Sequence, residues 1–123
     1  MPRPPLALAA AQCGLSSVVL DALPRPTRAQ DGFDGRSYAL ALSSQRMLNG
    51  LGLWDGLDDT AQPMQQIKVS DGRTGDAAVF LGLHFDSAEI EEGPMGYMLE
   101  DRFLRRAFLE AMAAEPAITH LSG

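Results

Sequence analysis

LALAAAQCGLSSVVLD, residues 6–21, is the stretch that decides the class of fold. Its first part, residues 6–12, is rich in Ala and Leu and predicts a helix, with the preceding prolines in its first turn. Gly14 follows where a helix C-terminal cap is expected. The apolar, β-branched run over 17–20 predicts a short buried strand of a parallel sheet, which ends at Asp21. Helix, tight turn, strand and acid in this order indicate an α/β fold.

The same kind of periodicity predicts further elements downstream. Either Ser43 or Ser44 is the expected N-cap of the next helix, and Asp101 is the expected cap of the last one. The expected elements, in chain order, are a loop over 24–34, a helix from Ser43, an apolar turn over 53–57, a hairpin of strands 64–69 and 77–85 with a turn at 70–73, a strand over 97–99, a helix over 101–114 and a strand over 118–121. Strands and helices therefore alternate around an inserted hairpin.

Length and composition limit the function. The chain has 123 residues, a formal net charge of −6 and 46% hydrophobic residues, which suits one domain or a piece of one with a core of its own. The acidic balance argues against a nucleic-acid partner, which needs a basic face to neutralise phosphates. The lone Cys13 excludes an internal disulfide framework and a cysteine-rich zinc site. Because His84 and His120 are far apart in the sequence, we expect no metal site.

The first residues bear on the compartment. A charged start over 1–5 runs into only six apolar residues, 6–11, which is shorter than the apolar region of a secretory signal. No stretch approaches the ~20 apolar residues that a membrane-spanning helix needs. The expected compartment is the cytoplasm, with a peripheral position at the inner membrane as a variant of it, and no transmembrane segment is expected.

Asp21 is the first candidate site residue. A strand that ends in an acid after a helix is typical of the second half of a dinucleotide-binding βαβ unit. A carboxylate only accepts hydrogen bonds, so it suits the two hydroxyls of a ribose. The alternative is a loop acid without a ligand, since any α/β protein can end a strand in Asp. The residues alone leave both interpretations open.

A longer set of stretches carries a family resemblance. The stretches are GL at 14–15, VVLDA at 18–22, FDGRSYAL at 33–40, SS at 43–44, LGLW at 51–54, IKVSD at 67–71 and GYMLEDRFLRRA at 96–107. In this order they resemble the N-terminal third of the FAD-dependent aromatic hydroxylases of ubiquinone biosynthesis, flavoprotein monooxygenases of the p-hydroxybenzoate hydroxylase type. The match is closest to the 2-octaprenyl-6-methoxyphenol hydroxylase branch, and it covers almost the whole chain from Leu6.

The resemblance implies roles for three positions. Asp21 matches the acid that binds the adenosine ribose of FAD, Arg36 the Arg near the cofactor phosphates, and Arg102 the Arg that reaches FAD from the other side. Arg suits phosphate because its guanidinium is permanently charged and forms a planar fork. For Arg36 the alternative is an ion pair with Asp31 or Asp34, and for Arg102 it is a solvated helix face.

The sequence departs from the family at its start. The family opens with a strand and a G-x-G-x-x-G turn that cradles the pyrophosphate, whereas residues 1–5 read MPRPP. Prolines also lack the N–H groups that such a loop uses. The pair Gly75-Asp76 superficially resembles a later Gly-Asp motif of the family, but its position favours a turn. No nucleophile–base set appears, so no catalytic side chain is assigned; this fits a flavin enzyme, whose cofactor carries the redox chemistry.

The expected architecture is thus α/β: a partial Rossmann-like FAD-binding domain with an inserted antiparallel hairpin, lacking its first strand and glycine loop. Residues 1–123 are interpreted as an incomplete N-terminal FAD-binding domain. The resemblance implies the FAD-binding portion of a monooxygenase that hydroxylates an aromatic ubiquinone precursor, with NAD(P)H as electron donor in the complete family. The isolated chain is expected to be inactive. The alternative is a non-enzymatic α/β interaction module, or a gene fragment, whose missing strand is covered by a partner chain.

Overall fold

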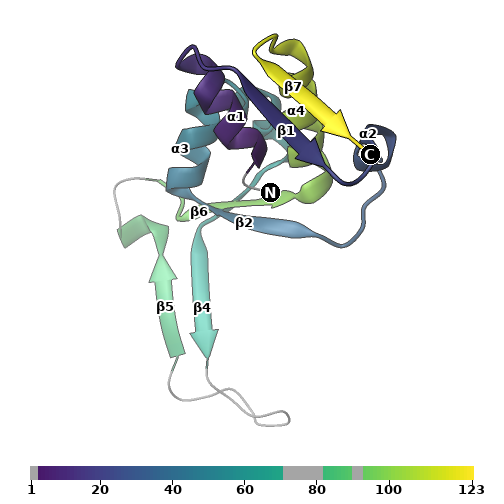
Figure 1. Ribbon diagram of the computed structural model, residues 1–123. Coiled ribbons are helices and arrows are strands. Elements are labelled where there is room, and N and C mark those ends of the chain that lie inside the picture. Colours follow the sequence, from purple (N-terminus) through teal and green to yellow (C-terminus); the bar gives the residue numbers. More distant parts are fainter. Residues whose placement is uncertain (1–2, 71–81, 90–92) are drawn as a thin grey trace.

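The computed structural model describes residues 3–70, 82–89 and 93–123, and Figure 1 shows their arrangement. The helices are α1 (Arg3–Gln12), α2 (Arg25–Arg28), α3 (Leu42–Gly50) and α4 (Asp101–Ala114), with 3-10 turns η1 (Trp54–Gly56), η2 (Asp58–Thr60) and η3 (Ser87–Glu89). The strands are β1 (Ser17–Asp21), β2 (Ser37–Ala41), β3 (Gln62–Met64), β4 (Gln66–Ser70), β5 (Gly82–Asp86), β6 (Gly96–Glu100) and β7 (Ile118–Ser122). The mixture of helices and strands confirms the α/β class.

A parallel pair of strands forms the layer that positions the site. β1 and β7 pair from Ser17 opposite Ile118 to Asp21 opposite Ser122, and α1 and α4 pack against them. Val19 and Ile118 are buried on the helix side. The expected strand and its parallel pairing are confirmed, but its full burial is wrong. On the other face the side chains are exposed, because no element of the described residues covers them: Val18 61%, Leu20 61%, Leu121 52%.

A second sheet has the order β2-β6-β3 and is antiparallel throughout. The sequence analysis expected β6 but not β2, which alternates weakly and pairs with β6 along its full length. At Gly96 the strands approach so closely that a Cβ atom would collide with the carbonyl of Leu40 and the side chain of Met64. Glycine is therefore required at this point of β6.

The expected hairpin is confirmed as a ribbon of β4 and β5 that projects from the body (Figure 1). The single strand expected over 64–69 is divided at Gln65 into β3 and β4, which belong to different sheets. Of the turn expected at 70–73, residues 71–73 lie outside the described residues, as do the strand residues 77–81 and the pair Gly75-Asp76. Ile67 faces Phe85 and Val69 faces Leu83, so one face of the ribbon is apolar.

The core lies between α1, α3, α4 and the sheets β1-β7 and β2-β6-β3. Trp54 and Leu57 are buried, which confirms the expected apolar turn. The rings of Trp54 and Tyr97 pack edge to face, with their centroids 4.8 Å apart. The buried apolar residues are Ala7, Leu8, Val19, Leu48, Trp54, Leu57, Leu99, Phe108, Leu109, Met112 and Ile118. In the described part of the chain, no helix has both the length and the apolar character to cross a membrane.

Both predicted helix caps are wrong. α3 begins at Leu42 with Ala41 as N-cap and no side-chain hydrogen bond, so neither expected serine caps it. The strand β2 leads directly into this helix, and that tertiary constraint sets its start. The bounds of α4 are those expected, but Asp101 is its first helical residue and is buried instead of capping it.

Candidate functional site

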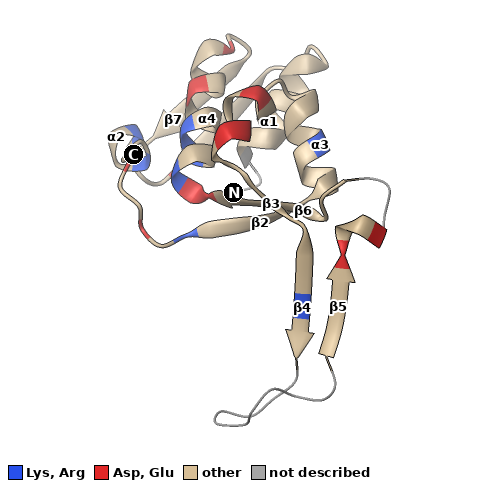
Figure 2. Ribbon diagram, turned by 180° about the vertical axis from the view of Figure 1, so that it is seen from behind, with Lys and Arg blue, Asp and Glu red and all other residues tan. Residues whose placement is uncertain are grey.

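A cavity of about 340 Å³ lies at the carboxyl end of β1, the edge at which α/β sheets bind ligands. Asp21, Arg28 and Arg105 line its polar side, and Pro4 at the start of α1 borders it. Phe108 is among the apolar side chains of its wall. Figure 2 shows that acidic and basic residues gather around α2 and the start of α4, whereas the ribbon is mostly uncharged.

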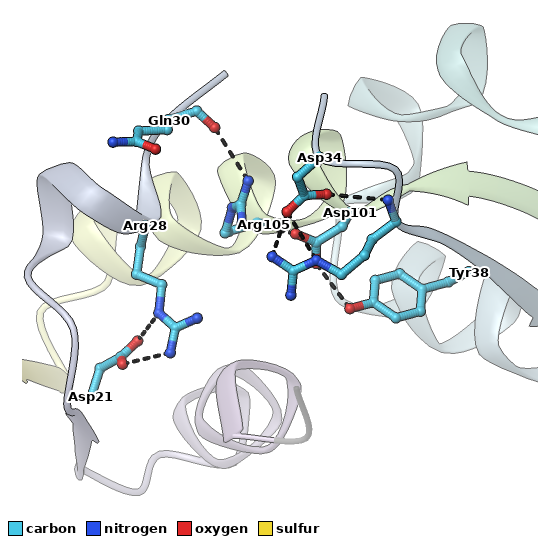
Figure 3. A network of polar contacts seen from close by, with 8 residues as sticks. Asp21, Arg28, Gln30, Asp34, Tyr38, Asp101 and Arg105 are labelled. Atoms are coloured by element: carbon cyan, nitrogen blue, oxygen red, sulfur yellow. Dashed lines mark hydrogen bonds and ion pairs between the residues drawn. The ribbon is translucent and has the colours of Figure 1, made fainter. Parts of the chain in front are cut away.

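Asp21 makes a two-point ion pair with Arg28. Nε and Nη2 of Arg28 donate to the two carboxylate oxygens, each at 2.8 Å (Figure 3). The backbone N–H of Leu23 donates to Oδ1 at 3.1 Å. The hydrogen bond from Arg28 is the main cause that lowers the pKa of Asp21 below its usual value. Arg28 lies within the expected loop over 24–34 and had no predicted role, because nothing in its spacing predicts that α2 turns it back to the end of β1.

Arg36 lies on the loop that joins α2 to β2. Its guanidinium forms an ion pair with Asp34, in which Nε donates at 2.9 Å, and its backbone N–H donates to the same carboxylate at 3.2 Å. Gly35 between them has φ +84°, the left-handed conformation that lets the loop turn back on itself. Of the two acids that the sequence offered Arg36, the structure pairs it with Asp34, and this bond lowers the pKa of Asp34. The pair is exposed, so it restrains Arg36 only weakly.

Arg102 lies in the first turn of α4 and reaches the same loop. Its Nε donates to Glu100 at 2.7 Å, and its Nη1 donates to the carbonyl of Asp31 at 3.3 Å. The guanidinium lies 4.6 Å from the ring centre of Phe103 and 5.9 Å from that of Phe33. About a third of the Arg102 side chain is exposed, so it is held in place more firmly than a solvated residue of a helix face.

The loop over 28–36 brings the three predicted site residues into one region. Asp21 contacts its first residue, Arg28, while Arg102 contacts the carbonyl of Asp31 and Arg36 is its last residue. Each of the three is already paired with a side chain of opposite charge. A ligand with phosphate or ribose groups would therefore exchange or share existing contacts.

The sequence analysis did not predict a buried polar cluster that lies beside this region. Asp101 is 2% exposed and accepts a hydrogen bond from the hydroxyl of Tyr38 at 2.9 Å. Its other carboxylate oxygen pairs with Arg105 at 2.8 Å, and Nη2 of Arg105 donates to the carbonyl of Gln30 at 3.2 Å (Figure 3). Although Arg105 is one of three arginines over 102–106, it is only 8% exposed. The signal that could have found the pair is the opposite charge at i and i+4 on one helix.

No group of three His, Cys, Asp or Glu side chains that could hold a metal occurs in residues 3–70, 82–89 and 93–123. His84 lies in the ribbon and His120 in β7. The site itself consists of a loop that carries Arg28 and Arg36 next to a carboxylate at a strand end. Such an arrangement can bind hydroxyl and phosphate groups.

The first comparison with known proteins concerns the fold. The fold matches the crystal structure of pqsL, a probable FAD-dependent monooxygenase from Pseudomonas aeruginosa, with a TM-score of 0.70 and 18% identity over 97% of this chain and 29% of that one. At this identity the match shows the fold alone. No family model matches the sequence.

The matches in sequence to curated relatives are more specific than this match in fold. The chain is 44% identical over 117 residues to ubiquinone hydroxylase UbiL of Rhodospirillum rubrum, covering 95% of this chain and 26% of the relative. It is 32% identical over 116 residues to 3-demethoxyubiquinol 3-hydroxylase of Escherichia coli, covering 93% and 28%. The predicted resemblance to the ubiquinone hydroxylases is confirmed, and the chain spans about a quarter of their length. The finer assignment to one branch stays a prediction.

Proposed function

We propose that the chain is the FAD-binding portion of a flavin-dependent monooxygenase that hydroxylates an aromatic ubiquinone precursor. The observation that carries this proposal is the 44% identity to a ubiquinone hydroxylase over 95% of the chain. Because the chain spans about a quarter of that relative, the hydroxylation, its substrate and its NAD(P)H donor belong to the proposal. Residues 1–123 would form an incomplete N-terminal FAD-binding domain of a Rossmann-like kind.

Asp21 would bind the adenosine ribose. Its carboxylate lies at the carboxyl end of β1 and lines the cavity there. Two bonds from Arg28 and one from Leu23 leave part of its acceptor capacity, since a carboxylate offers about four lone-pair sites. A ribose diol could therefore share Asp21 with Arg28, and Arg28 would hold the carboxylate ionised and oriented.

Arg36 and Arg102 would bind the phosphate side of the cofactor. Both carry permanent charge, and their present partners, Asp34 and Glu100, are at least a third exposed and can turn into solvent. The bound flavin would supply the redox chemistry for hydroxylation with dioxygen, while these side chains bind and orient it. No side chain of this chain is assigned a catalytic step.

The first turn of α1 limits how well the chain can bind FAD. Helix N-termini bind phosphate through free backbone N–H groups, and Pro4 and Pro5 have none. No glycine lies in this turn, and we propose that the turn lacks the glycine loop with which the dinucleotide motif binds phosphate. We therefore propose that this chain by itself binds FAD weakly or not at all and is inactive.

Titration of the purified chain with FAD, followed by flavin fluorescence, tests the proposal. We expect weak, saturable quenching that is lost in the Asp21→Ala/Arg36→Ala/Arg102→Ala variant and kept in Asp59→Ala, a matched exposed acid. Quenching that is equal in all three proteins would contradict the assigned site. A chain that purifies yellow with stoichiometric FAD would contradict the role given to the prolines.

A second candidate function is an interaction module that needs a partner chain. Among residues 3–70, 82–89 and 93–123, β1 pairs with β7 on one edge only, and its outer face exposes Val18 and Leu20, 61% each. A partner chain could cover both features, with a strand paired at the open edge and another element packed on the outer face. A strictly monomeric, well-folded chain on size exclusion would contradict this candidate. For either function the proposed compartment is the cytoplasm, including the inner membrane surface, since Cys13 is a free thiol.

A further inference from the structure

The buried pair of Asp101 and Arg105 is not among the side chains assigned to the cofactor, although Arg105 lines the cavity, and its burial needs an explanation of its own. Charged side chains are almost never fully buried unless they are paired, and a buried ion pair costs desolvation energy on both sides. Here Asp101 is 2% and Arg105 8% exposed. The contacts that compensate for this cost come from outside the helix, and they indicate what the pair holds.

Two of these contacts bracket the loop over 30–36. Nη2 of Arg105 donates to the carbonyl of Gln30 at 3.2 Å, at the start of the loop. The backbone N–H of Asp101 donates to the carbonyl of Arg36 at 3.0 Å, at its end. Both donors lie in the first turns of α4. The loop is therefore anchored at each end to one helix, with Gly35 free to make its turn between them.

The third contact fixes Asp101 itself. The hydroxyl of Tyr38 donates to Oδ1 of Asp101 at 2.9 Å, and Tyr38 is held by β2, in which it pairs with Leu99 of β6. Asp101 is thus fixed by β2 on one side and by Arg105 on the other (Figure 3). A displacement of Asp101 would move the anchors at both ends of the loop.

We propose that Asp101 is a positioning residue: with Tyr38 and Arg105 it fixes the loop over 30–36 and so presents Arg36 at the edge of the candidate site. Within the described part of the chain Arg36 forms its ion pair with Asp34 of the same loop, and that exposed pair moves with the loop. A phosphate-binding guanidinium gains affinity when the protein fixes it before the ligand arrives. The importance of this for FAD rests on the proposed function, whereas the anchoring of the loop does not.

Limited trypsin digestion of the folded chain tests the anchoring. Cleavage after Arg36 reports opening of the loop, and cleavage after Arg46 within α3 reports unfolding of the body. We expect Tyr38→Phe, which removes one hydroxyl, to raise the rate after Arg36 about tenfold relative to that after Arg46. Asp101→Asn should raise the same ratio further. If Asp101→Asn fails to fold, the phenylalanine variant alone decides the result.

Arg106→Gln is the matched control. Arg106 also reaches the loop from α4, but its pair with Asp31, at 3.3 Å, is exposed. We expect less than about a twofold change in the cleavage ratio for this variant. An unchanged ratio in Tyr38→Phe, or equal acceleration at Arg36 and Arg46, would overturn the positioning role. Since trypsin needs no cofactor, the digestion tests the positioning role whether or not the chain binds FAD. The FAD titration tests the proposed function separately.

Discussion

The start of α4 and the β4–β5 ribbon depart from the usual distribution of side chains in opposite ways. The start of α4 buries a charged pair, Asp101 and Arg105, at 2% and 8% exposure. The ribbon exposes the four apolar side chains of one face: Ile67, Val69, Leu83 and Phe85, between 37% and 63%. In most proteins charged side chains are exposed and large apolar side chains are buried, so both regions are informative exceptions. The two regions differ in how many other elements of the fold contact them.

Neighbours explain the contrast. Asp101 receives contacts from β2, from α4 and through Arg105 from the loop, so most of its polar atoms have partners. The ribbon pairs only with itself among the described residues, and a two-stranded hairpin without a packed face is marginally stable. Removing a partner should therefore be costly in the first region and cheap in the second.

The largest effect is expected from a substitution that breaks the buried ion pair. Asp101→Ala removes one member of the buried pair and leaves the charge of Arg105 without a partner, which costs about 3–5 kcal/mol. Urea denaturation followed by Trp54 fluorescence measures this loss in the free energy of unfolding. Asp59→Ala, an exposed acid, is the control and should leave the midpoint unchanged. A loss in Asp101→Ala as small as that of the control would show that burial does not set the cost.

An intermediate effect is expected at the partly exposed pair of Asp21 and Arg28, which are 20% and 26% exposed. Asp21→Asn should cost about 1 kcal/mol at neutral pH. The pKa of Asp21 is lowered by the hydrogen bond from Arg28, so the stabilisation is present above the ordinary Asp value of about 3.9 and is lost as the pH falls through the lowered pKa.

Urea midpoints of the parent and of Asp21→Asn at pH 7 and pH 3 measure this dependence. The difference between the two proteins should shrink at the lower pH. A difference that stays constant or grows on acidification would assign the stabilisation to some other property of Asp21.

The smallest effect is expected in the ribbon. Val69→Thr and Leu83→Thr replace paired, half-exposed residues and should change the free energy of unfolding by less than about 0.5 kcal/mol. Leu99→Ala, in the core at 1% exposure, should cost about 2–5 kcal/mol under the same conditions. If the ribbon variants cost as much as the core variant, the apolar face is packed against something and the contrast between the two regions fails.

Local patterns predicted the parts of the fold that depend on local physics. The strand ending at Asp21, the helix over 101–114 and the hairpin follow from periodicity, and the structure has all three. β2 was missed because its partner β6 is about 60 residues away and its own alternation is weak. The serine caps of α3 failed for a similar reason, because the entry from β2 fixes where that helix starts.

The candidate site was predictable by residue type but not by partner. The resemblance selected Asp21, Arg36 and Arg102, and the structure places all three around one loop. It could not indicate that each is already ion-paired. Three arginines within five residues of α4 look alike in sequence, yet Arg105 alone of them is buried, because it alone stands one turn after the buried Asp101.

The parallel pair of β1 and β7 has a consequence for synthesis. Its paired residues are about 100 positions apart, so β1 leaves the ribosome long before β7 exists. At ~5–20 residues per second, β1 waits on the order of 5–20 s with both edges open. During that time its Val-Val-Leu run is available to other strands. The late synthesis of β7 therefore leaves an apolar strand of the nascent chain without its partner for that whole interval.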